Sequence, residues 1–151
     1  MYERVGRLAV SLRQRYGQGS PLELCDQMGI PVLEEELPES VEGFYVKNGG
    51  AAIVLRRGLD PARKEYICAH ELGHVLLHSG VNRFFLEEET LFPAGRMEGE
   101  ADLFAAYLLL DGNVETLRDE YEQLTVEQAA ALTGLPPEAV AMRYAQDLPN
   151  S

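Results

Sequence analysis

The stretch that decides the fold is Cys68-Ala69-His70-Glu71-Leu72-Gly73-His74-Val75-Leu76-Leu77-His78. It carries His-Glu-x-x-His within an apolar run that contains no proline, and this pattern predicts a buried helix. Residues four apart on a helix lie one above the other, with roughly 5–6 Å between Cβ atoms, so His70 and His74 can share one metal ion. Glu71 falls about 100° further round, where a general base would take a proton from a metal-bound water. Histidines on an apolar helix also serve as ordinary core residues, so the motif alone leaves both interpretations open.

The composition predicts one globular domain. The chain has 151 residues, of which 46% are hydrophobic, and this is enough for a single core. A formal net charge of −12 argues against a nucleic-acid surface and against an anionic membrane face, because both depend on clustered Lys and Arg. No run approaches the ~18 apolar residues of a membrane span, and the N-terminus lacks the hydrophobic segment of a signal peptide. We therefore expect a cytoplasmic protein without direct contact to nucleic acid or membrane.

The segments before the motif show helix and strand patterns in turn. The predicted elements are helices over 2–16 and 21–28, a strand over 30–37, and a hairpin of 43–47 and 51–55. The motif helix should begin at Asp60-Pro61 and continue to about His78, because an aspartate cap followed by proline is typical of a helix start. From its place in the hairpin alone, we expect the strand over 51–55 to be the edge along which a substrate chain lies.

A third ligand is expected on the next helix, predicted over 97–110. The apolar residues of this helix fall within about 40° of Met97 and define its buried face. Glu100 falls on the flank of that face, whereas Glu98 and Asp102 fall at about 100° and 140° and are predicted to point away. A partly buried carboxylate needs a charge partner, which a divalent cation provides. Glu100 is therefore the predicted third ligand, with a rim glutamate paired to an arginine as the alternative.

Other residues near the motif have less certain roles. His78 lies eight residues after His70, about 12 Å along a continuous helix, too far to bind the same ion. We expect it to be a structural residue or to lie beside the ligands rather than among them. Asp102 and Asp111 either orient the ligands or have ordinary surface roles. Tyr66, Tyr107 or an arginine are candidates for stabilising an oxyanion. The segment 79–96 has no clear period, and its aromatic residues either cover a metal cleft or anchor the loop in the core.

Two motifs of the chain occur together: the His-Glu-Leu-Gly-His stretch and Glu98-Gly99-Glu100-Ala101-Asp102-Leu103-Phe104-Ala105-Ala106. Together with the order of elements over 1–112, they resemble the ImmA/IrrE family of zinc-dependent metallopeptidases. The resemblance implies a minimal zincin-like α+β fold, zinc bound by His70, His74 and Glu100, and Glu71 as the catalytic base. It also implies a protein substrate, typically a helix-turn-helix transcriptional repressor whose cleavage relieves repression. The chain departs from the family pattern at Asp111, where proline is frequent.

The remainder of the chain, 113–151, is predicted to be a helical segment packed on a metallopeptidase core formed by 1–112. Helices are expected over 114–122, 125–132 and 136–146, with a spacing that resembles a helix-turn-helix. Residues 122–151 hold four acidic residues and one arginine, a charge that repels phosphate, so packing or partner docking is the expected role. The alternative to an enzyme is a non-catalytic, zinc-containing module that binds and inactivates a repressor without cleaving it.

Overall fold

The computed structural model describes residues 2–78, 94–111 and 124–146 of the chain. Its elements, in chain order, are α1 (Glu3–Tyr16), α2 (Pro21–Gln27), β1 (Val32–Glu35), β2 (Gly43–Lys47), β3 (Ala51–Arg56), α3 (Pro61–His78), α5 (Ala94–Ala106), the π-helix η1 (Tyr107–Asp111), α7 (Val126–Thr133) and α8 (Pro137–Ala145). The predicted helices, hairpin and motif helix that fall on described residues are present, and the predicted α+β class is confirmed.

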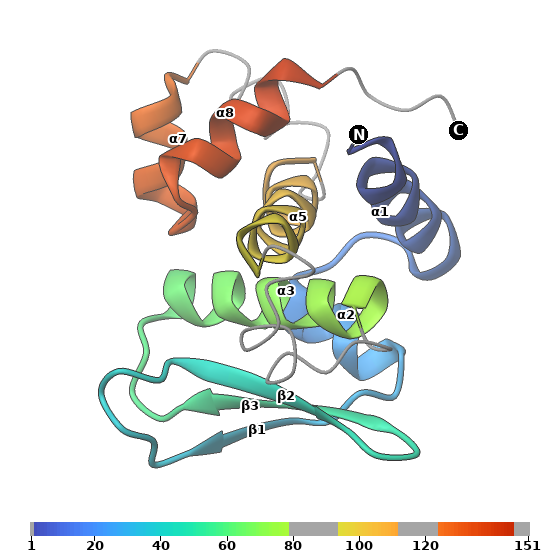
Figure 1. The fold of residues 1–151 in the computed structure, drawn as a ribbon, viewed down its shortest axis with the longest axis vertical. Helices are drawn as coiled ribbons and strands as arrows, with labels where there is room; N and C mark the ends of the chain where they lie inside the picture. The colour runs from blue at the N-terminus through green and yellow to red at the C-terminus, as the bar shows by residue number, and fades with distance from the viewer. Residues whose placement is uncertain (1, 79–93, 112–123, 147–151) are drawn as a thin grey trace.

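The described elements form layers above a single sheet (Figure 1). The sheet has the strand order β1-β3-β2, with β3 parallel to β1 and antiparallel to β2. Helices α2 and α3 cover one face of this sheet, and α5 lies on the far side of α3, between it and α8 (Figure 1). The motif helix is therefore the middle of the molecule, which is why its residues 66–75 are buried on both sides.

The central strand of the sheet is β3, and this overturns one expectation. Ile53 of β3 lies opposite Val32 of β1 and opposite Tyr45 of β2, and its side chain is fully buried. The prediction that the strand over 51–55 forms an open edge is wrong, because the hairpin pattern identifies only one of its two neighbours. Within the described residues, β2 pairs with β3 alone, so β2 provides the edge nearest to α3.

The motif helix begins with local chemistry that the sequence indicates. The Asp60 carboxylate accepts a hydrogen bond from the backbone N–H of Arg63 at 2.9 Å, and Pro61 occupies the first helical position. This cap satisfies one of the N–H groups that a helix start leaves unpaired. The position of the cap sets where the helix starts and so fixes which residues of α3 meet α5.

Helices α3 and α5 approach closely at a glycine. A Cβ atom at Gly73 would lie 3.1 Å from Phe104 Cδ1 and 3.2 Å from the backbone Cα of Ala101. A side chain here would have to push these neighbours back by a few tenths of an ångström, so glycine favours this spacing. The close approach brings the acidic residues of α5 within reach of the histidines of α3.

The C-terminal helices complete the described structure. Thr125 and Gln128 form a capping box at the start of α7, as their sequence spacing indicates. Helix α8 packs on α5, and α7 contacts α3. The expected helix over 114–122 and the expected boundary between 112 and 113 lie outside the described residues, so the division into 1–112 and 113–151 stays a prediction. Across the parts of the chain that the structure describes, no helix is long and apolar enough to cross a membrane.

Candidate metal centre

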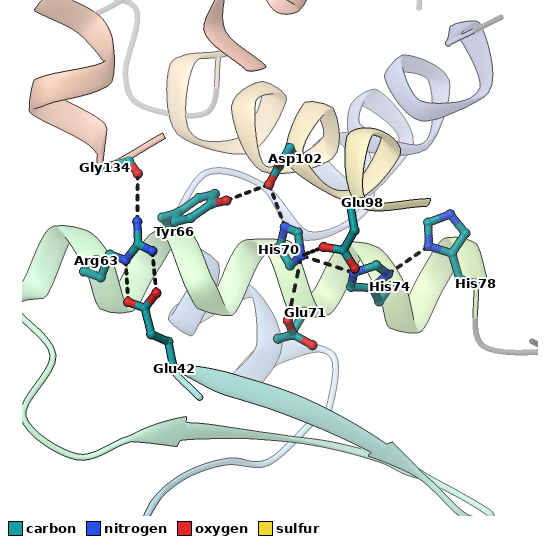
Figure 2. A network of polar contacts seen from close by, with 10 residues as sticks. All are labelled: Glu42, Arg63, Tyr66, His70, Glu71, His74, His78, Glu98, Asp102 and Gly134. Atoms are coloured by element: carbon teal, nitrogen blue, oxygen red, sulfur yellow. Dashed lines mark hydrogen bonds and ion pairs between the residues drawn. The ribbon is translucent and has the colours of Figure 1, made fainter. Parts of the chain in front are cut away.

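His70 and His74 present the same ring nitrogen to one point between α3 and α5 (Figure 2). Their Nε2 atoms are 3.1 Å apart, and the side chains are 9% and 0% exposed. Ligand nitrogens of a tetrahedral zinc ion, with Zn–N bonds of about 2.0–2.1 Å, lie about 3.3 Å apart. The two imidazoles are therefore spaced as one cation requires.

Glu98 of α5 supplies a carboxylate to the same point. Its Oε2 atom is 2.8 Å from Nε2 of His70, and its Oε1 atom is 3.1 Å from Nε2 of His74. Burial raises the pKa of Glu98, but the hydrogen bonds to the two imidazoles outweigh it and hold the pKa well below its usual range. Two imidazoles and one carboxylate from two helices thus converge, and this donor set fits a divalent metal ion.

Glu71 lies beside this point rather than in it. Its Oε2 atom is 3.9 Å from Nε2 of His70, the side chain is buried, and it projects toward the sheet (Figure 2). His70, Glu71 and His74 all offer possible ligand atoms within 4.8 Å of one another. Because Glu98 is closer to His70 than Glu71 is, we regard Glu98 as the better ligand and Glu71 as the better base.

Asp102 holds the other nitrogen of His70. Its Oδ1 atom lies 2.7 Å from Nδ1 of His70 and also accepts the hydroxyl of Tyr66 at 2.7 Å. Burial lowers the pKa of His70, but the hydrogen bonds to Asp102 and Glu98 outweigh it and raise the pKa to about 9. Because Nδ1–H donates to Asp102, Nε2 is the nitrogen that faces the metal centre, as in metal sites generally.

A helix with His-Glu-x-x-His that faces a carboxylate on a second helix indicates a metallopeptidase, and comparison with known proteins agrees. The sequence model of the peptidase family described as the IrrE N-terminal-like domain matches residues 25–144. The chain belongs to this family.

Relatives support the assignment. Over 140 residues the chain is 33% identical to the uncharacterized immunity region protein 2 of Bacillus phage phi105, covering 92% of this chain and 88% of that protein. It is 25% identical over 127 residues to metallopeptidase ImmA of Bacillus subtilis strain 168, covering 83% and 75% of the two chains. A solved Mycobacterium tuberculosis transcriptional regulator has a similar fold, with a TM-score of 0.60 and 18% identity over 95% of this chain, which spans 56% of that regulator.

The family's Glu-x-Glu-Ala-Asp stretch is arranged differently from the expectation. The prediction that Glu98 and Asp102 point away from the site is wrong, since both contact His70. The contact of Asp102 with Nδ1 is the one expected of a residue that orients a ligand. Glu100 is buried as predicted, but its oxygens lie 3.2 Å from Nε2 of His78 and 3.4 Å from the guanidinium of Arg4. Glu100 as a ligand stays a prediction, and the geometry favours Glu98.

The reason for the error lies in the burial of α5. The fully buried side of α5 is apolar, whereas Glu98 and Asp102 lie on a partly exposed side, with 38% and 23% of their side chains accessible. The contacts to His70 form on that partly exposed side, so a search of the apolar face alone did not find them. A different signal was present: Glu98 and Asp102 are four residues apart, as are His70 and His74. Such pairs each lie on one helix face and can meet across a helix–helix contact.

Both tyrosines suggested as oxyanion donors make other contacts in the structure. The Tyr66 hydroxyl binds Asp102 on the Nδ1 side of His70, away from the metal centre, and burial together with Asp102 raises the pKa of Tyr66. Tyr107 lies under the guanidinium of Arg143, 4.6 Å from its ring centroid. Nδ1 of His78 lies 3.0 Å from Nδ1 of His74, and its place beside the ligands stays a prediction.

Arg63 connects the centre to the sheet and to the C-terminal helices (Figure 2). Its guanidinium pairs with both carboxylate oxygens of Glu42, and it contacts the carbonyl oxygen of Gly134 at 3.5 Å. The same group packs over the Tyr66 ring, 5.1 Å from the centroid. The position of Tyr66, and through it Asp102, therefore depends on contacts from three parts of the chain.

Proposed function

We propose that this chain is a zinc-dependent endopeptidase in which His70, His74 and Glu98 hold the ion and Glu71 is the general base. The observation that carries the proposal is the convergence of both Nε2 atoms, 3.1 Å apart, with the Glu98 oxygens at 2.8 and 3.1 Å. Two imidazoles and a carboxylate leave a coordination position for water or substrate, as catalytic zinc sites do. Manganese or iron would accept the same ligands, so metal analysis tests the identity of the ion.

The chain's own residues account for the proton transfers of peptide hydrolysis. A bound zinc ion supplies Lewis-acid chemistry, in that it acidifies a water molecule and polarises the scissile carbonyl. Glu71 is buried 3.9 Å from Nε2 of His70, where it takes the water proton and passes it to the leaving amine. Asp102 keeps His70 in the tautomer that has its lone pair on Nε2.

The substrate chain is proposed to lie along β2. Tyr45 of this strand stacks on His74, with ring centroids 5.9 Å apart, so the strand passes directly beside the metal centre. In the described part of the chain, the outer edge of β2 pairs with no other strand. An extended peptide can add to such an edge through backbone hydrogen bonds.

The substrate class is proposed to be a cytoplasmic helix-turn-helix transcriptional repressor. The family resemblance implies this class, and one relative is named for a phage immunity region. Charge supports the choice, because a chain with a net charge of −12 complements the basic surface by which a repressor binds DNA. The same complementarity would serve the alternative function, a zinc-containing module that binds a repressor without cleaving it.

Intact-mass spectrometry of a repressor encoded beside the gene for this chain tests the proposal. The repressor is incubated with zinc-loaded wild type, with Glu71→Gln, and with Glu65→Gln as a control on the same helix. Glu65 accepts the backbone N–H of Leu22 and lies away from the metal centre, and glutamine preserves this acceptor. We expect two fragments with wild type and control, and an intact repressor with Glu71→Gln at unchanged zinc content. An intact repressor that binds equally to all three proteins would instead establish the non-catalytic module.

A further inference from the structure

His74 differs from His70 in the group that holds its second nitrogen. Nδ1 of His70 lies 2.7 Å from the Asp102 carboxylate, whereas Nδ1 of His74 lies 3.0 Å from Nδ1 of His78. Nε2 of His78 lies 3.2 Å from Oε1 of Glu100. The three side chains are 0%, 4% and 5% exposed, so this row of contacts is shielded from water.

The hydrogen positions along this row follow from the metal centre. If Nε2 of His74 is a ligand, it carries no hydrogen, and Nδ1–H must donate to Nδ1 of His78. His78 then carries its own hydrogen on Nε2 and donates it to the Glu100 carboxylate, which is an acceptor. Each ring nitrogen of His74 and His78 thus has one role, as metal ligand, donor or acceptor, that matches the group beside it.

We propose that His78 and Glu100 form a relay of positioning residues that fixes the tautomer and orientation of His74 for metal binding. The inference rests on the proposed metal centre and extends it by two residues. It also assigns Glu100 a role in which it touches no metal. In this arrangement the two ligand histidines are oriented in different ways. Asp102 contacts His70 directly, whereas Glu100 acts on His74 through the imidazole of His78.

The helix geometry explains why an imidazole stands between His74 and Glu100. His78 is one turn beyond His74 on α3, so its ring lies beside that of His74, with centroids 5.2 Å apart. Glu100 and Asp102 are two residues apart on α5 and project about 200° from one another, so one helix cannot present both directly to adjacent histidines. His78 spans the remaining distance.

Arg4 of α1 completes the row at its outer end. Its guanidinium lies 3.4 Å from Oε2 of Glu100, and its side chain is 56% exposed. An ion pair as exposed to solvent as this one contributes little to stability on its own. Its contribution is to keep the second oxygen of Glu100 occupied, so that Oε1 faces His78.

Zinc affinity, measured by competition with a chromophoric chelator, tests the relay. Loss of a residue that orients a ligand typically weakens metal binding about 10–100-fold, and we expect this of His78→Leu. His78→Gln should lose less, because its amide oxygen can accept the His74 hydrogen. Glu100→Gln should lose less than Glu100→Leu, since it keeps the acceptor for His78. Thr133→Val is the matched control, because it removes a buried hydroxyl on α7 that bonds only within its own helix and loop.

The hydrogen on Nδ1 of His74 gives a readout that a purely structural role would not change. In the zinc-loaded wild type, nitrogen-15 NMR of labelled histidine should show a slowly exchanging Nδ1–H on His74. In His78→Leu this hydrogen should exchange fast, whereas Thr133→Val should leave it unchanged. Wild-type affinity and slow exchange in His78→Leu or, should that variant not fold, in Glu100→Leu would overturn the relay. A loss in Glu100→Gln as large as that of a Glu98 variant would also overturn it, whereas failure of the wild type to bind metal would refute the proposed function itself.

Discussion

Asp102 accepts the Nδ1–H of His70 at 2.7 Å from the helix that also carries Glu98. One helix face therefore carries both the residue that contacts Nδ1 of His70 and the carboxylate proposed as the third ligand. The two residues are a single turn apart, so they move together if α5 shifts. The metal centre is in this sense a property of the contact between α3 and α5 and not of the His-Glu-x-x-His motif alone.

Replacing Asp102 with alanine should weaken zinc binding by about 10–100-fold, because His70 then loses the acceptor that fixes its tautomer. Chelator competition measures the change. Asp111→Asn is the control: Asp111 pairs with Arg143 and lies on η1, so this change should leave zinc affinity as it is. Equal affinity of Asp102→Ala and wild type would show that the contact does not orient the ligand.

The third ligand is distinguished by comparing Glu98→Ala with Glu100→Ala. Loss of a direct ligand should cost more than the ~10–100-fold typical of an orienting residue, so Glu98→Ala should bind zinc more weakly than Glu100→Ala. Zinc content after dialysis and cobalt absorption spectra both report the outcome. The reverse order would establish Glu100 as the ligand, as the family resemblance implies.

The motif helix could be predicted from residues that are neighbours in the sequence. The order of the strands could not, because it depends on contacts between distant parts of the chain. Asp60-Pro61 and the apolar run up to His78 identify α3, since capping and periodicity are written in neighbouring residues. The position of β3 in the middle of the sheet depends on pairing with β1, which lies about twenty residues earlier and has no short-range signature.

The role of Glu98 was missed for a related reason. A helical wheel locates the apolar face of α5, but Glu98 lies on a partly exposed side of this helix, with 38% of its side chain accessible. Which side of such a helix meets α3 is set by Gly73, where the two backbones approach. Nothing in the wheel of α5 itself records that contact.

As the pH rises, the stability of the metal-free protein should fall, whereas its affinity for zinc should rise. The groups that face His70 are Glu98 and Asp102 from α5 and Tyr66, Glu71 and His74 from its own helix. Burial lowers the pKa of His70, but the carboxylates of Asp102, Glu98 and Glu71 outweigh it and raise the pKa from 6.5 to about 9. Because the pKa of His70 is higher in the folded than in the unfolded protein, its protonation stabilises the fold. This stabilisation is complete below pH 6.5 and is lost as the pH rises through about 9.

Zinc competes with the same proton, so its affinity should rise by up to about tenfold per pH unit over this interval and level off above it. Urea unfolding of the metal-free protein and chelator competition, each at several pH values, give the two slopes. A zinc affinity independent of pH between 6.5 and 9 would show that His70 is already neutral in the metal-free protein.

Gly73→Ala and Gly99→Ala make a matched pair on the two helices that carry the donors. The added methyl at Gly73 would lie 3.2 Å from the Cα of Ala101, and a backbone atom yields only if α5 moves. At Gly99 the nearest atom is the Tyr2 hydroxyl at 3.9 Å, an ordinary contact. Overpacking costs typically ~1–3 kcal/mol, and alanine in a helix gains up to ~1 kcal/mol over glycine.

Gly73→Ala should therefore destabilise the protein by about 1–2 kcal/mol, and Gly99→Ala should stabilise it by up to about 1 kcal/mol. Urea unfolding without metal measures both values. Because the donors lie on both helices, Gly73→Ala should also weaken zinc binding, whereas a site built from α3 alone would keep its affinity. A neutral or stabilising Gly73→Ala with undiminished zinc affinity would show that the α3–α5 spacing is not what assembles the metal centre.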